Sequence, residues 1–99
     1  MGTILGMWEV YEHRRVVKQH AVLPLEILKR YEKWKDIAMV SGPTGLRLIK
    51  GFRDEALRGD WHGHRSSRLG IHYRVIYRVI AKDCIFQVIS ITPHDYRRK

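Results

Sequence analysis

The clearest pattern in the chain lies in its last third, where apolar and polar residues alternate over residues 71–80. Alternation with a period of two is typical of a β-strand that buries one face and leaves the other in water. The predicted buried side carries Tyr73, Val75, Tyr77 and Val79. The opposite side carries His72, Arg74 and Arg78, with Ile76 among them. The strand is therefore expected to present a cationic face to solvent.

A second strand is predicted directly after a short turn over residues 81–83. Residues 84–91 are apolar on nearly both sides, as is usual for a central strand, and this strand should pair with the one before it. It is followed at once by a polar, titratable segment that contains His94 and Tyr96. We therefore expect the end of this strand and the cationic face of its neighbour to form one site.

The N-terminal half is predicted to form one strand and two helices. Residues 3–11 favour a strand, and residues 14–22 place apolar side chains along one stripe of a short helix. Pro24 is well placed to open a second helix, which should run to about Val40. The segment 41–45 contains two glycines and a proline, which predicts a stop and a turn.

The remaining residues should complete a sheet. We expect a short strand over residues 46–50, a loop over 51–56, and a polar strand over 61–69 that turns at Gly70 into the alternating strand. This order predicts an α+β fold, with an N-terminal strand and a two-helix pair packed on a three- to four-stranded antiparallel sheet. No repeat or linker interrupts the 99 residues, so we expect a single domain over 1–99.

Charge narrows the range of partners. Nineteen Lys and Arg against ten Asp and Glu give a net charge of +9, and the isoelectric point is about 10.1. Such a surplus of positive charge favours binding to a polyanion, above all to nucleic acid. A solvated basic surface or an acidic protein partner would also explain it. The single cysteine, Cys84, excludes an internal disulfide. No apolar run approaches the roughly 20 residues that span a bilayer, and no signal peptide is recognisable, so we expect a cytoplasmic chain without a membrane partner.

Six histidines invite a metal site, but their spacing does not support one. His62 and His64 would share a face on a strand, yet no third ligand is placed by spacing. A His-Glu-x-x-His motif, a cysteine pair, a glycine-rich phosphate loop and a Gly-x-Ser-x-Gly motif do not occur in the sequence. We therefore expect neither a metal nor a cofactor.

What remains is a set of groups suited to cutting RNA without a metal. Such a reaction needs a base for the ribose 2′-hydroxyl proton, an acid for the leaving 5′-oxygen, and cations against the phosphorane between them. The candidates are Arg74, Arg65 and Arg68 for charge, His94 as proton donor or acceptor, Glu55 as base, and Tyr96 to position or relay a proton. The wider predicted RNA-binding surface comprises Arg68, His62, His64, Lys50 and Arg78. Each group also has a plainer explanation, as a solvated loop, a turn or a simple phosphate contact.

Three segments of the chain also carry a family resemblance through their order and spacing. They are Leu57-Arg58-Gly59-Asp60-Trp61, Tyr73-Arg74-Val75-Ile76-Tyr77, and Val88-Ile89-Ser90-Ile91 followed by His94-Asp95-Tyr96. Together they resemble the RelE/ParE superfamily of bacterial toxins from toxin–antitoxin pairs, closest to mRNA interferases of the RelE, YoeB, YafQ and HigB types. The resemblance covers residues 46–98 by motif, and residues 8–40 only in the order of elements. It implies the fold described above and ribosome-dependent cutting of mRNA.

The resemblance implies roles for single residues. Arg74 would face the scissile phosphate, and Glu55 stands where YoeB-like members carry a glutamate, as a candidate base. The phosphate-binding cations would be Arg65 and Arg68, and the polar end of the last strand would be His94 and Tyr96. The lysine pair of RelE is absent, which leaves the choice of base and acid open.

The resemblance also implies partners, and two rival functions stay open beside it. The implied partners are a cognate antitoxin, acidic or amphipathic, and the 30S A site of the ribosome with its mRNA. One rival is a ParE-like toxin that inhibits DNA gyrase without cutting nucleic acid, and the other is a passive nucleic-acid-binding module. Cleavage of mRNA on ribosomes, lost in Arg74→Ala or His94→Ala, would identify an interferase. A passive module should show salt-dependent binding that survives His94→Ala.

Overall fold

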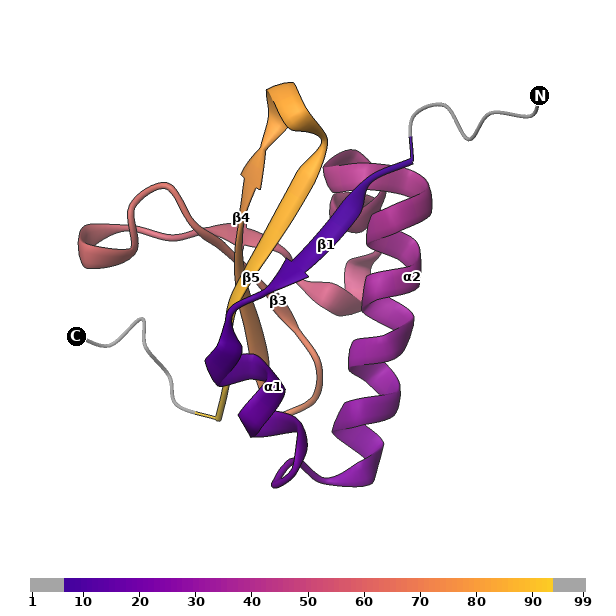
Figure 1. Cartoon of the computed structure of the whole chain (residues 1–99), viewed down its shortest axis with the longest axis vertical. Helices are drawn as coiled ribbons and strands as arrows, with labels where there is room; N and C mark the ends of the chain where they lie inside the picture. Colours follow the sequence, from indigo (N-terminus) through magenta and orange to yellow (C-terminus); the bar gives the residue numbers. More distant parts are fainter. Residues whose placement is uncertain (1–6, 94–99) are drawn as a thin grey trace.

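A computed structural model describes residues 7–93 of the chain, in which the long helix α2 runs beside a sheet and the short helix α1 lies near one end of it (Figure 1). The elements are β1 (Glu9–Glu12), α1 (Arg14–His20), α2 (Leu25–Leu48), η1 (Lys50–Phe52), β2 (Glu55–Ala56), η2 (Gly59–Trp61), β3 (Arg65–Arg68), β4 (Arg74–Ile80), η3 (Ala81–Asp83) and β5 (Ile85–Thr92). The predicted α+β class is confirmed. No helix within residues 7–93 is long and apolar enough to cross a membrane.

The sheet contains five strands in the order β1-β5-β4-β3-β2. The strands from β2 to β5 pair antiparallel with their neighbours, whereas β1 runs parallel to β5. The sheet is wider than the predicted three to four strands for two reasons. The N-terminal strand joins its edge instead of standing apart, and residues 55–56, predicted as loop, pair with β3.

Helix α2 buries an apolar stripe against the sheet. Tyr31, Trp34 and Ala38 follow the spacing of one helix face, and all three are fully buried. The ring centroid of Trp34 lies 5.2 Å from that of Tyr77 and 5.8 Å from that of Phe86, both on the sheet. Trp34 is therefore a core residue, as the helical spacing predicted.

Helix α2 is longer than predicted and continues to Leu48. Gly42 interrupts it with a φ of 70° and a ψ of −170°, and Pro43 then restarts helical backbone at a first-turn position. A Cβ atom on Gly42 would lie 2.7 Å from Nε1 of Trp8, so the position needs glycine both for its φ and for this close approach. The predicted strand over residues 46–50 is therefore wrong, because these residues finish the helix and enter η1.

The two strands that carry most of the predicted site are shorter than expected. The alternating strand is β4, in which Val75 and Tyr77 are buried on the α2 side as predicted. Ile76 points to the opposite face but is only 1% exposed, so that face is not uniformly wet. The polar strand predicted over residues 61–69 is limited to β3, because residues 59–61 form the turn η2.

Candidate functional site

Arg74 is held in place on the sheet by groups from two neighbouring segments. Its Nε donates a hydrogen bond to Oγ of Ser66 at 3.0 Å, and its Nη2 donates to the carbonyl oxygen of Arg53 at 2.9 Å. The same Nη2 lies 3.5 Å from Oε2 of Glu55, and the Arg74 side chain is 12% exposed. A guanidinium that is already ordered can bind a phosphate without paying the entropy of ordering first.

The strand register explains why these groups meet. Glu55 pairs with Ser66, and Ser66 pairs with Ile76, so the three side chains share one face of the sheet. Arg74 lies two residues before Ile76 on β4 and therefore on the same face, opposite Arg68 of β3. Trp34 of α2 contacts Tyr77 and Ser67 on the other face. The side chains of Glu55, Ser66, Arg68 and Arg74, on this side of the sheet, are called the Arg74 face below.

Behind the Arg74 face, Asp54 is a carboxylate whose side chain is 0% exposed. Its Oδ1 accepts a hydrogen bond from Nε of Arg65 at 2.7 Å. Its Oδ2 accepts from Oγ of Ser67 at 2.7 Å and from the hydroxyl of Tyr77. Ser67 in turn accepts from Nε1 of Trp34 at 2.9 Å. The buried charge is thus paired with one cation and two hydroxyls, as a buried carboxylate requires.

This buried network helps to position the Arg74 face through the backbone on both sides of Asp54. Asp54 stands between Arg53, whose carbonyl accepts from Arg74, and Glu55, whose carboxylate lies beside Arg74. Arg53 adopts a left-handed conformation with a φ of 43°, which is uncommon for a residue with a side chain. Anchoring Asp54 therefore fixes both neighbours, and with them two of the contacts that orient Arg74.

Two buried tyrosines have raised pKa values. Burial is the largest cause that raises the pKa of Tyr77 above its usual 10.0. The charge and the hydrogen bond of Asp54 raise it further, whereas Arg65 opposes the shift. Burial, followed by the hydrogen bond to Glu12, raises the pKa of Tyr31 in the same direction, and the two oxygens lie 2.6 Å apart. Both tyrosines therefore keep their protons in the folded chain at a pH where they would lose them in the unfolded chain.

Stability should consequently fall at alkaline pH. A raised folded-state pKa gives stability that is fully present below the unfolded pKa and is lost as pH rises through the folded value. Above the usual tyrosine pKa we expect the free energy of unfolding to drop by up to about 1.4 kcal/mol per pH unit for each tyrosine. Urea unfolding between about pH 8 and about pH 11 measures this slope, which Tyr77→Phe should reduce. An equal slope in Tyr77→Phe would contradict the assignment.

Comparison with solved structures shows which known proteins share this fold. No protein-family model and no curated protein match the sequence. A chain of the archaeal RelE–RelB complex from Pyrococcus horikoshii OT3 matches with a TM-score of 0.73 at 28% identity, over 91% of this chain and 98% of that chain. The chain has the fold of the RelE/YoeB toxin superfamily. The YoeB–YefM toxin–antitoxin complex from Staphylococcus aureus gives 0.69 at 16% identity over 88% and 97%, and YafQ from E. coli gives 0.61 at 16% over 86% and 91%.

In this RelE-like chain, three of the predicted site residues come together. Arg74 and Glu55 lie side by side, and Arg68 pairs opposite Arg74. Arg78 lies on the same face four residues further along β4, where its Nε donates to Oε1 of Gln87 at 2.8 Å. The exposed position of Arg78 suits the predicted contact with RNA backbone.

Arg65 is placed differently from the other predicted cations. Alternation along β3 turns it to the face of Ser67, where it pairs with Asp54 and points away from Arg74. Burial works against its charge, but the hydrogen bond and the charge of Asp54 outweigh burial and raise the pKa of Arg65. Its side chain is still 22% exposed. A catalytic role for Arg65 stays a prediction.

The predicted residues Lys50, His62 and His64 come from loops. Lys50 opens η1 and is exposed. His62 and His64 flank Gly63, which has a φ of 90°, so they do not share a strand face as predicted. The ring of His64 packs edge-on to that of Trp61, with centroids 5.4 Å apart. Among residues 7–93, no three His, Cys, Asp or Glu side chains lie close enough to hold a metal ion.

Two predicted residues lie outside the described part of the chain, and three important ones were not predicted. His94 and Tyr96 fall beyond residue 93. The unpredicted residues are Asp54, Ser66 and Ser67. The two serines offered one signal, because adjacent residues of a strand point to opposite faces and one of the pair had to face the core.

Proposed function

We propose that this chain is the toxin of a type II toxin–antitoxin pair and a ribosome-dependent endoribonuclease that cuts mRNA without a metal. One observation carries the proposal: Nη2 of Arg74 and Oε2 of Glu55 lie 3.5 Å apart on the Arg74 face. A cation for phosphate and a carboxylate for a proton can therefore reach the same phosphodiester. The likeness of the fold to RelE and YoeB supports this function.

The proposed reaction is an attack of a ribose 2′-hydroxyl on the neighbouring phosphorus. Arg74 binds a non-bridging oxygen and stabilises the added negative charge of the phosphorane. Glu55 accepts the 2′-hydroxyl proton while the 2′-oxygen bonds to phosphorus, and the bond from phosphorus to the 5′-oxygen breaks. The leaving oxygen takes a proton from an acid, and we assign this role to His94, a proton donor or acceptor by its sequence, with Tyr96 as the candidate to position or relay the proton. The products are a 2′,3′-cyclic phosphate and a 5′-hydroxyl.

The charge of the chain suits both proposed partners. A net charge of +9 favours association with the RNA that lines the ribosomal A site in the cytoplasm. Arg68, opposite Arg74 on β3, and Arg78, four residues further along β4, extend the cationic surface. The same charge favours an acidic antitoxin, and the matched complexes of RelE with RelB and of YoeB with YefM support a protein partner of this kind.

Induction of the chain followed by mapping of mRNA 5′ ends tests the proposed function. We expect new 5′-hydroxyl ends within translated reading frames and none in untranslated regions. Intact mRNA together with inhibited DNA supercoiling would instead identify a gyrase inhibitor. Intact mRNA with undisturbed supercoiling would leave a passive nucleic-acid-binding protein.

Glu55→Gln should separate proton transfer from RNA binding. Glutamine keeps the shape of the side chain and an oxygen for Arg74, but it cannot accept the 2′-hydroxyl proton. We expect kcat on ribosome-bound mRNA to fall on the order of 10²-fold with little change in KM. Glu26→Gln, at an exposed carboxylate of α2, is the matched control and should leave both unchanged. An unchanged kcat in Glu55→Gln would exclude Glu55 as the base.

A further inference from the structure

The side chain of Gln19, on α1, makes two hydrogen bonds to the end of β5. Its Oε1 accepts from the backbone N–H of Ile91 at 2.9 Å, and its Nε2 donates to Oγ of Ser90 at 3.3 Å. Ser90 is 8% exposed and Ile91 is 1% exposed, so water has little access to these two groups of β5. An amide supplies an acceptor and a donor together, and this strand end uses both.

The contacts of Gln19 begin where the pairing of β5 with β1 ends. The parallel pairing runs as far as Glu12 opposite Val88, and the N–H of His13 then donates to the Val88 carbonyl oxygen at 2.9 Å. The chain enters α1 directly afterwards. The acceptor for Ile91 therefore comes from a side chain, and Gln19 takes the place of a further residue of β1.

A β-bulge explains why the backbone of Ile91 faces α1. The register of β4 and β5 shifts and leaves Ile89 as an extra residue between Val88 and Ser90. The backbone groups of a strand point alternately to its two neighbours, and an extra residue shifts this alternation by one. Val88 and Ile91 therefore both turn backbone groups to the β1 side, and Ile91 depends on Gln19 for its acceptor.

Helix α1 is anchored well enough to fix the strand end, beside which it lies in Figure 1. Val16 of α1 is fully buried. Nε2 of His20 lies 3.5 Å from Oε2 of Glu12 on β1, and the same oxygen accepts from the hydroxyl of Tyr31 at 2.6 Å. Helix α1 is thus attached to the core, to β1 and, through Glu12, to α2.

The strand end that Gln19 contacts lies next to Arg74. Thr92 is the last residue of β5 and pairs with Arg74 of β4. From Thr92 the sequence continues through Pro93 to His94, the residue assigned to protonate the leaving oxygen in the proposed reaction. The position of Thr92 therefore determines where the segment with the proposed acid begins.

We propose that Gln19 is a positioning residue for this acid. By holding the end of β5, Gln19 sets where His94 meets the leaving 5′-oxygen, without contacting RNA itself. The attack of the 2′-hydroxyl is separate from this role, because Glu55 belongs to β2 at the opposite edge of the sheet from β1. The inference rests on the proposed function, since it concerns one step of that reaction. A displacement of about 1 Å at a reacting group can slow a reaction by about 10²-fold.

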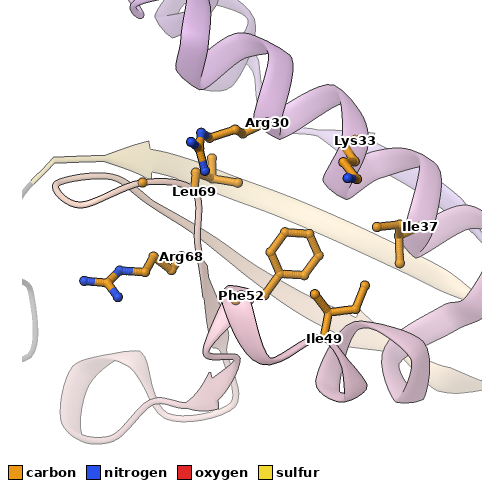
Figure 2. Close-up of a pocket in the computed structure, with 9 residues that line it drawn as sticks. Arg30, Lys33, Ile37, Ile49, Phe52, Arg68 and Leu69 are labelled. Carbon is orange, nitrogen blue, oxygen red and sulfur yellow. The ribbon is translucent and has the colours of Figure 1, made fainter.

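The proposed RNA contact of Arg68 should not depend on Gln19. Arg68 borders a groove of about 400 Å³ between α2, η1 and the end of β3 and extends away from α2 (Figure 2). The apolar residues that line the groove are Ile37, Ile49, Phe52 and Leu69. None of the described lining residues belongs to α1 or β5. Loss of the Gln19 contacts should therefore change kcat and leave KM nearly unchanged.

The experiment compares two mRNAs that differ in one atom at a mapped cut. One mRNA carries the ordinary 5′-oxygen at that phosphate, and the other carries sulfur in its place. A thiol is a much stronger acid than an alcohol, so the sulfur leaves as a thiolate with the electron pair of the broken bond and needs no proton from an acid. Single-turnover cleavage of both mRNAs on ribosomes is measured with the full chain.

Gln19→Met removes both hydrogen bonds and keeps an unbranched side chain of similar length. We expect kcat on the oxygen mRNA to fall on the order of 10-fold, and the rate on the sulfur mRNA to change by less than about twofold. Gln19→Glu keeps an acceptor for Ile91 and should stay within about threefold of wild type on both mRNAs. Val17→Met, at an exposed position of α1, is the matched control and should cut both at the wild-type rate.

Two further variants complete the design. Glu55→Gln should slow cleavage of both mRNAs, because the 2′-hydroxyl must lose its proton whichever atom leaves. Gln19→Asn, whose amide is one carbon shorter, replaces Gln19→Met if the latter chain does not fold, and the same results are expected of it.

The outcomes separate this inference from the proposed function. Slowing by Gln19→Met that is confined to the oxygen mRNA and restored in Gln19→Glu supports the inference. Equal slowing of both mRNAs would show a general structural role and overturn it, as would an unchanged rate on the oxygen mRNA or a Gln19→Glu chain as slow as Gln19→Met. Cleavage of neither mRNA by the wild-type chain would overturn the proposed function, and this inference with it.

Discussion

Replacing Arg74 with alanine is expected to lower the rate of mRNA cleavage on ribosomes by about 10³-fold. Three contacts, with Ser66, the Arg53 carbonyl and Glu55, hold the guanidinium in one position before RNA binds. In the proposed reaction its charge would therefore meet the phosphorane without reorganisation, and the stabilisation would be greatest in the transition state. We expect kcat to fall much more than KM rises, because the proposed RNA-binding residues Arg68 and Arg78 are left in place.

Single-turnover cleavage of ribosome-bound mRNA measures this effect, and two further variants define its cause. Arg74→Lys keeps the charge but loses the fork of the guanidinium, so its rate should be intermediate. Arg78→Ala, on the same face of β4, should weaken binding and its salt dependence while kcat stays close to wild type. Wild-type kcat in a folded Arg74→Ala chain would contradict the proposed role.

Replacing Asp54 with alanine is expected to lower the free energy of unfolding by about 3 kcal/mol. The change removes the shared acceptor of Arg65, Ser67 and Tyr77 and leaves two buried hydroxyls and a partly buried cation without it. Removing one partner of a buried network costs more than the network contributes, because the remaining polar groups stay desolvated.

Urea unfolding measures the effect of Asp54→Ala, with Asp36→Ala as the matched control. Asp36 is an exposed residue of α2, so its replacement should change the free energy of unfolding by less than about 0.5 kcal/mol. Folded Asp54→Ala should also cut mRNA more slowly, because Arg53 and Glu55 lose the anchor between them. Equal stability of the two variants would show that the buried carboxylate is not a structural centre.

The helical and alternating patterns predicted the parts of the fold that bury one face. Tyr31 and Trp34 follow helical spacing, and Val75 and Tyr77 follow strand spacing, so their burial could be read from periodicity. Residues 46–50 could not be placed in the same way. A proline after a glycine stops a helix in most chains, but here Pro43 begins a second helical segment directly behind the break at Gly42.

The position of a site residue could be predicted where strand alternation alone decides on which face of the sheet its side chain lies. Arg74 was expected on a cationic face, and the structure adds Glu55 beside it. The face on which each side chain lies could not be predicted for Arg65 and Arg68. These residues are three positions apart and therefore lie on opposite faces of β3. Which of the two would face Arg74 depends on the pairing register, and that register is set by tertiary contacts.

The buried role of Asp54 had no local signal. Asp54 and Glu55 are adjacent acids in a polar segment, and nothing in their neighbours along the chain distinguishes them. The environments of the two side chains differ because Glu55 pairs with Ser66 on one face of the sheet, whereas Asp54 accepts hydrogen bonds on the other face. Its donors there are Arg65, Ser67 and Tyr77. Such a difference arises from contacts more than ten residues apart in sequence, which periodicity does not describe.

The most direct measurement of the central claim uses an mRNA with a single 2′-deoxynucleotide on the 5′ side of a mapped cut. Ribosomes programmed with this mRNA and with its all-ribose counterpart would be incubated with the wild-type chain. We predict that cleavage at that phosphate disappears in the deoxy mRNA while other cuts persist, because the attacking oxygen is missing. Cleavage of both mRNAs at that phosphate at the same rate would contradict 2′-hydroxyl attack and the roles proposed for Arg74 and Glu55.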